Sequence, residues 1–128
     1  MFTPIFPAGA AKPIAPYVPA TKAGNTIYVG GTLAIDQQGK SLYPGDMKAQ
    51  TRYVIEQIKS ALSAGQATLD DVAYNMIFIK RVQDYAALNE VYAEYFGKNP
   101  PARYCIVTEL VREEFLVEIS SVAHVGPA

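Results

Sequence analysis

Arg103 is the first residue in this sequence whose type and position suggest chemistry. It opens a run of aromatic and β-branched residues, and only Ala102 separates it from the pair Pro100-Pro101. A guanidinium group can hold a carboxylate through two parallel hydrogen bonds, so an arginine aimed into a cleft would bind a small organic acid. An arginine at a strand end can equally be a solvated surface residue, and position alone leaves both interpretations open.

Glu118 is the second candidate, because it lies inside the otherwise uncharged run 116–122. A buried carboxylate without a partner is costly, so Glu118 is expected to face a partner, an interface or a site. Burial raises the pKa of a carboxyl group, which suits a general acid or base. The alternative is an ordinary solvent-facing strand residue, and the scarcity of charge nearby favours the site.

Cys105 and His124 are single residues of their types. One cysteine excludes an internal disulfide, and the two together cannot build a metal cage, so no metal site is expected. Cys105 lies two residues after Arg103, which places both side chains on one face of a strand. A cysteine nucleophile needs a nearby base, and without one the sequence favours a small residue packed beside a pocket.

Tyr17 and the pair Gly30-Gly31 differ from their neighbours. Tyr17 lies between Pro16 and Pro19 in a proline-rich stretch, residues 1–20, which should run extended over the surface. A tyrosine there could be presented to a ligand rather than packed. The glycine pair is too short for a phosphate-binding loop, and it indicates a bulge or a close backbone approach.

Residue periodicity predicts the elements that position these side chains. Residues 3–6 allow a short edge strand, and residues 21–43 predict a hairpin or meander with a turn at 24–25 and a strand that continues to residue 35. Residues 46–64 predict a helix with Asp46 as its N-cap and Gly65 at its end.

The second half of the chain continues this alternation. Residues 72–79 predict a strand buried on both faces, and residues 84–96 predict a helix capped by Asp84 and ended by Gly97. Residues 103–108 and 116–125 are expected to form a final antiparallel pair. The resulting order predicts an α+β fold, with two helices on one face of one sheet. The other face needs a cover, and self-association is the simplest one.

Composition narrows the classes of function. The chain of 128 residues is 50% apolar and 18% charged, with a net charge of −1, and Lys80-Arg81 is its longest basic run. Proteins that grip nucleic acid usually carry a basic stripe, so this balance disfavours such a partner. A secretion signal and an apolar run long enough for a membrane span are both lacking, so a cytoplasmic protein with a single domain, 1–128, is expected.

The candidate residues lie in motifs of one protein family. The run Pro101–Cys105 reads P-A-R-Y-C and resembles the P-A-R-x-C signature of the RidA/YjgF family. Further runs resemble that family in the same order: 14–18, 28–32, 89–92 and 117–119. The resemblance extends over nearly the whole chain.

The resemblance implies a chorismate-mutase-like fold with a mixed sheet, packed as a homotrimeric barrel with sites between subunits. It implies hydrolysis of a reactive enamine or imine carboxylic acid to the carbonyl acid and ammonia, without a cofactor. Its site residues correspond here to catalytic Arg103, Glu118 and Tyr17, with Arg103 on the carboxylate and Glu118 as acid/base. The substrate-binding residues correspond to Gly31, Asn89 and Cys105.

Within the family, three runs resemble the RutC-like aminoacrylate deaminases of pyrimidine catabolism: 31–37, 48–52 and 85–94. This implies 3-aminoacrylate or 2-aminoacrylate as substrate. Gly30 departs from the serine of many relatives, which removes a hydroxyl near the pocket. A non-catalytic sensor of small carboxylates, an RNA-acting translation inhibitor and a holdase-like protein remain as alternatives.

Overall fold

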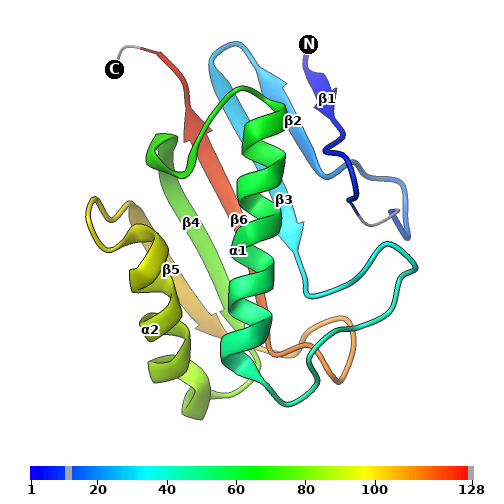
Figure 1. Cartoon of the computed structure of the whole chain (residues 1–128), viewed down its shortest axis with the longest axis vertical. Coiled ribbons are helices and arrows are strands. Elements are labelled where there is room, and N and C mark those ends of the chain that lie inside the picture. Colours follow the sequence, from blue (N-terminus) through cyan, green and yellow to red (C-terminus); the bar gives the residue numbers. More distant parts are fainter. Residues whose placement is uncertain (11–12, 127–128) are drawn as a thin grey trace.

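The computed structural model describes residues 1–10 and 13–126, which form six strands and two α-helices (Figure 1). The strands are β1 (Thr3–Ile5), β2 (Ala20–Ala23), β3 (Thr26–Thr32), β4 (Val72–Ile79), β5 (Ala102–Val107) and β6 (Val117–His124). The helices are α1 (Met47–Ala64) and α2 (Tyr85–Phe96), with short 3-10 turns at Leu69–Asp71 and Val82–Asp84.

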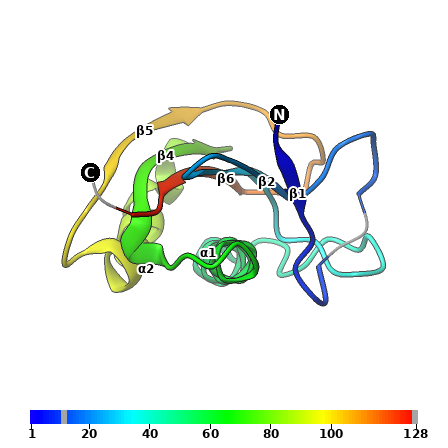
Figure 2. The same cartoon turned by 90° about the horizontal axis from the view of Figure 1, so that it is seen from above.

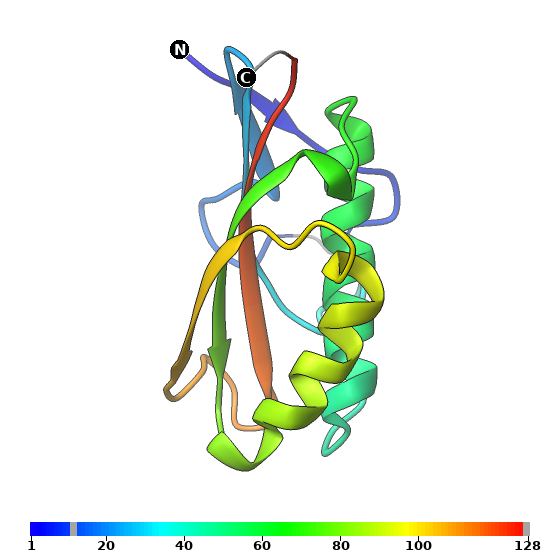
Figure 3. The ribbon, with the colours of Figure 1, turned by 90° about the vertical axis from the view of Figure 1, so that its left-hand side faces the viewer.

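All six strands belong to one mixed sheet in the order β1-β2-β3-β6-β4-β5. The pair β4–β5 is parallel, and the other neighbours are antiparallel. Figures 2 and 3 show both helices on the same face of the sheet. The predicted α+β architecture, with one sheet and two helices on one face, is confirmed. We call the other face the open face.

Helix α1 forms where the sequence predicts it. The Asp46 side chain accepts a hydrogen bond from the Ala49 N–H, so it caps the first turn as expected. Buried residues repeat along one side of the helix and pack on the sheet: Met47, Gln50, Thr51, Val54, Ile55, Ile58, Ala61 and Leu62. Gly65 ends the helix, although Gln66 rather than Gly65 takes the left-handed conformation, with φ 65°.

The predicted hairpin is shorter than residues 21–43. Strands β2 and β3 pair around the turn at Gly24, which has φ 58°. The expected bulge lies between Val29 and Thr32, where the register with β6 shifts. The predicted continuation through residue 35 is wrong: beyond Thr32 the only pairing in the described segment is a single bridge between Ile35 and Ser41.

The predicted antiparallel pairing of the last two strands is wrong. Strand β6 lies between β3 and β4, and β5 lies at the sheet edge, parallel to β4. Parallel neighbours need a crossover connection, which α2 supplies between β4 and β5. Consecutive strands often pair, but here β6 forms its ladders with β3 and β4 in the centre of the sheet.

Two further predictions need correction: burial of the strand 72–79 on both faces, and capping of the second helix by Asp84. Strand β4 buries Asn75, Ile77 and Ile79, whereas Met76 and Phe78 on the open face are only half-buried, since this chain places no layer there. Asp84 precedes α2 without capping it, because its carboxylate accepts a hydrogen bond from Arg81 instead. The expected edge strand near residues 3–6 is present as β1. The extended stretch predicted for residues 1–20 includes residues 11 and 12, which lie outside the described part.

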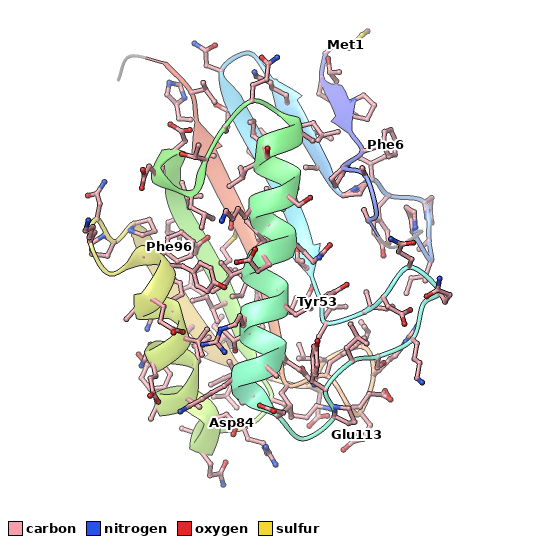
Figure 4. All side chains as sticks on the ribbon, viewed as in Figure 1. Met1, Phe6, Tyr53, Asp84, Phe96 and Glu113 are labelled. Atoms are coloured by element: carbon pink, nitrogen blue, oxygen red, sulfur yellow. The ribbon has the colours of Figure 1, made fainter. Side chains whose placement is uncertain are left out.

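Gln50 ties the segment before β6 to the start of α1. Its side chain is fully buried; the amide donates to the carbonyls of Tyr43 and Glu114 and accepts from the Leu116 N–H at 2.9 Å. Figure 4 labels Glu113 in this segment, which lies beside the connection that leads into α1. Gln50 therefore fixes the point at which β6 begins.

We predict that Gln50→Leu lowers the free energy of unfolding by about 1–3 kcal/mol, since it leaves the buried Leu116 N–H without an acceptor. Urea denaturation measures the change. Gln57→Leu, on the same helix, is the matched control and should change stability much less. An equal effect of the two substitutions would contradict this role of Gln50.

Candidate functional site

Helix α2 holds the guanidinium group of Arg103. Arg103 lies opposite Asn75 in the β4–β5 ladder, on the helix-covered face. Its Nη2 atom donates to Asn89 Oδ1 at 2.6 Å and to Tyr85 Oη at 3.2 Å. Two residues from successive turns of α2 thus orient one half-buried guanidinium group, which can offer hydrogen bonds to an anion.

The ring of Tyr92 packs against the guanidinium group of Arg103. The guanidinium carbon lies 4.6 Å from the ring centroid, within cation–π range. The Tyr92 hydroxyl accepts a hydrogen bond from Asn75 Nδ2 at 3.0 Å, and Asn75 Oδ1 accepts one from Ser121. Asn75 and Ser121 are buried, so a satisfied polar chain through the core fixes the ring.

Tyr85, Tyr92 and Asn75 belong to this site but were not among the residues predicted for it. Tyr85, Asn89 and Tyr92 recur at spacings of four and three residues, which places them on one side of a helix. That spacing was the available signal, although the sequence does not show that this side faces Arg103.

Cys105 shares the helix-covered face with Arg103, as predicted. It is half-buried against the core. Burial raises the pKa of its thiol, and the nearby charge of Arg103 offsets only part of this effect. A thiol that stays neutral is a weak nucleophile, so the geometry favours a packed residue beside the arginine.

Glu118 lies on the open face, beside Phe78 of β4. It is half-buried, and burial raises the pKa of its carboxyl group. The side chain covers the backbone of Gly31 so closely that a Cβ atom at residue 31 would overlap Glu118 Oε2. The predicted close approach at the glycine pair is therefore the approach of Glu118 to Gly31.

Tyr17 and Gly31 line a cavity of about 110 Å³ between the N-terminal segment, β3 and α1. Tyr17 is 54% exposed, so the tyrosine is presented to solvent as the flanking prolines suggested. Gly30 also lines the cavity, and a Cβ atom there would make only ordinary contact with the Pro19 carbonyl. His124 lies apart, exposed at the end of β6. No cluster in the described residues has three or more ligands suited to a metal ion.

The predicted site residues fall into two groups in one chain. Arg103, Asn89 and Cys105 lie together on the helix-covered side, whereas Glu118 and Gly31 lie together on the open face. Arg103 pairs with Asn75 and Glu118 with Phe78, three residues along β4, so their side chains point to opposite faces. They are also about 10 Å apart across the strands and about 10 Å along them.

We predict that Gly31→Ala lowers the pKa of Glu118. The new methyl group displaces the carboxylate into solvent, and the loss of burial favours the charged form. The wild-type carboxyl keeps its proton to higher pH than an exposed glutamate, so its titration should move to lower pH in the variant. Carbon-detected NMR of the carboxyl group measures the shift.

Gly30→Ala is the matched control, because a Cβ atom at residue 30 meets no side chain of Glu118. Its Glu118 titration should match the wild type. An unchanged titration in Gly31→Ala would mean that the backbone at Gly31 does not confine the carboxylate.

The chain is similar to proteins of known family and fold. A family model described as Endoribonuclease L-PSP matches residues 8–125. The chain is 51% identical over 121 residues to the 3-aminoacrylate deaminase RutC of Acinetobacter baylyi, covering 94% of this chain and 96% of that protein.

Solved structures show the same fold. A protein of Thermotoga maritima described as a putative endoribonuclease matches with a TM-score of 0.90 and 30% identity, covering 97% of this chain and 98% of that one. RidA of a Psychrobacter species matches with a TM-score of 0.86 and 31% identity, over 94% and 98% of the chains. Escherichia coli TdcF with bound serine matches with a TM-score of 0.88 and 26% identity, over 97% and 99%. The resemblance predicted from the sequence motifs is confirmed, and the chain belongs to the RidA/YjgF family, the family of the Endoribonuclease L-PSP model.

Proposed function

We propose that this protein hydrolyses 3-aminoacrylate to 3-oxopropanoate and ammonia. The observation that carries the proposal is the guanidinium group of Arg103, which residues of α2 orient so that it can bind a carboxylate. The chain is also 51% identical to a 3-aminoacrylate deaminase. The enzyme class predicted from the motifs, a hydrolase acting on C–N bonds, agrees with the name of that relative.

Arg103 binds the substrate carboxylate in this proposal. Asn89 and the ring of Tyr92 keep the guanidinium group in one orientation, so little ordering remains to be done when the anion arrives. The relative TdcF was solved with bound serine, a small molecule that carries a carboxylate. The guanidinium charge also withdraws electron density from the conjugated enamine.

Proton transfer then makes the enamine hydrolysable. Protonation of the carbon next to the carboxylate gives an iminium ion, water adds to the far carbon, and the carbinolamine expels ammonia. Glu118 carries the proton or activates the water, a role that suits a carboxyl group whose pKa burial raises from its ordinary value toward neutrality. Tyr17 donates to the leaving nitrogen. Uncatalysed hydrolysis of such enamines is fast, so these groups need to supply only a modest acceleration.

One chain cannot place Arg103 and Glu118 around one small substrate, because they point to opposite faces of its sheet. We therefore propose a homotrimer whose sites take Arg103, Asn89 and Cys105 from one subunit and Tyr17, Gly31 and Glu118 from the next. The open face supports this assembly, since it exposes the large apolar side chains of Tyr28, Tyr104 and Ile106. Isolated soluble chains rarely leave such a face uncovered.

We predict that the wild type accelerates the decay of 3-aminoacrylate generated in situ, and that Arg103→Ala falls to the spontaneous rate. Loss of a bidentate charged contact removes both binding and orientation of the substrate. Absorbance of the enamine reports the rate, and circular dichroism checks that the variant is folded. Full turnover by folded Arg103→Ala would contradict the proposal.

We predict that a mixture of two inactive variants regains activity. In mixed trimers of Arg103→Ala and Glu118→Gln, sites that combine the intact Arg103 of one chain with the intact Glu118 of its neighbour are wild-type. Random assembly of an equal mixture of the two chains makes about a quarter of all sites complete. The mixture, unfolded and refolded together, should therefore show about a quarter of the wild-type rate.

The same variants test the alternatives. The control for complementation is a mixture of the two folded variants that is not unfolded, so that subunits do not exchange. This mixture should regain no activity. A carboxylate sensor would keep its affinity in Glu118→Gln and show no turnover in the wild type. An RNA-acting protein would bind RNA with a steep dependence on salt, which a net charge of −1 does not favour.

A further inference from the structure

Tyr85 occupies part of the hydrogen-bonding surface that a carboxylate needs on Arg103. It is the first residue of α2 and is 44% exposed, so its hydroxyl is accessible from solvent. Its oxygen accepts a hydrogen bond from Arg103 Nη2 at 3.2 Å, and the ring centroid lies 5.9 Å from the guanidinium carbon. The contact with Asn89 at the same nitrogen is much shorter, at 2.6 Å.

The choice of nitrogen matters, because Nη2 belongs to both edges through which a guanidinium group binds a carboxylate. One edge pairs Nε with Nη2, and the other pairs Nη1 with Nη2. Asn89 and Tyr85 both accept from Nη2, and because this nitrogen carries two hydrogens, two acceptors use up its capacity to donate. A carboxylate can thus form two parallel bonds only when one of these contacts yields, and the longer, more exposed contact with Tyr85 is the one to yield.

We propose that the Tyr85 hydroxyl holds the place of a carboxylate oxygen in the unliganded protein and donates its own hydrogen to that oxygen when the substrate binds. The phenol oxygen accepts from Arg103, so its hydrogen is free to point at an acceptor on the solvent side. Rotation of the hydroxyl and a small shift of an exposed side chain complete the exchange. Tyr85 is then a substrate-binding residue that selects carboxylates, and this rests on the proposed role of Arg103.

The selection follows from what each ligand offers to the two groups. A carboxylate presents two acceptor oxygens, one for Arg103 and one shared with Tyr85. A carboxamide of the same shape presents one oxygen and an NH₂ group, which cannot accept from either donor. A hydrogen bond to a charged group contributes more than a neutral one, so removing the hydroxyl should weaken carboxylate binding selectively.

trans-Crotonate is the probe, because it is 3-aminoacrylate with a methyl group in place of the amine and is not consumed. NMR titration gives its dissociation constant for the wild type and for Tyr85→Phe, beside that of trans-crotonamide. We expect Tyr85→Phe to weaken crotonate binding about tenfold, which corresponds to about 1.4 kcal/mol. Crotonamide binding should not change.

Tyr95→Phe is the matched control, since it removes a hydroxyl from the same helix that donates to Glu56 and not to the site. It should bind both probes like the wild type. Tyr85 is exposed and the change is conservative, so thermal unfolding should match the wild type. Equal or tighter crotonate binding by Tyr85→Phe, equal weakening of both probes, or no crotonate binding by the wild type would each overturn the proposal.

This binding experiment is separate from turnover. Acceleration of 3-aminoacrylate decay with unchanged crotonate affinity in Tyr85→Phe would leave the proposed function in place and remove the role of Tyr85. Selective loss of crotonate affinity in Tyr85→Phe, without any turnover by the wild type, would support the role of Tyr85 and contradict the proposed function.

Discussion

The position of β6 between β3 and β4 is the constraint on which the rest of this structure depends. It places the last strand in the middle of the sheet and moves β5 to the edge. Because β5 runs parallel to β4, α2 must cross over between them, and it then lies against the face that carries Arg103. The same arrangement puts Glu118 on the open face beside Gly31.

Burial of polar side chains maintains this arrangement. Gln50 fixes the start of β6 through backbone groups of the preceding segment, and Asn75 joins Ser121 of β6 to Tyr92 of α2. Each of these groups would be costly to bury alone, and each has a partner. The interior thus connects the central strand to the helix that orients Arg103, so fold stability and site geometry depend on the same contacts.

The two faces of the sheet carry different parts of the proposed chemistry. The helix-covered face holds an oriented cation, and the open face holds a half-buried carboxyl group whose pKa is raised. Separation within a chain prevents Arg103 and Glu118 from neutralising each other in a salt bridge. In the proposed trimer the cation and the proton carrier would meet only across the interface between two subunits.

The sequence by itself determined the elements and the family. Capping by Asp46, the apolar repeat of α1 and the bulge at the glycine pair follow from local rules, and the motif at 101–105 identified Arg103. Strand order, the partners of β5 and the roles of Tyr85 and Tyr92 did not follow. Pairing between strands far apart in the chain depends on which ladders bury the most surface, and local periodicity carries no record of that competition. For the same reason, only the tertiary structure decided that Arg103 and Glu118 lie on opposite faces of the sheet.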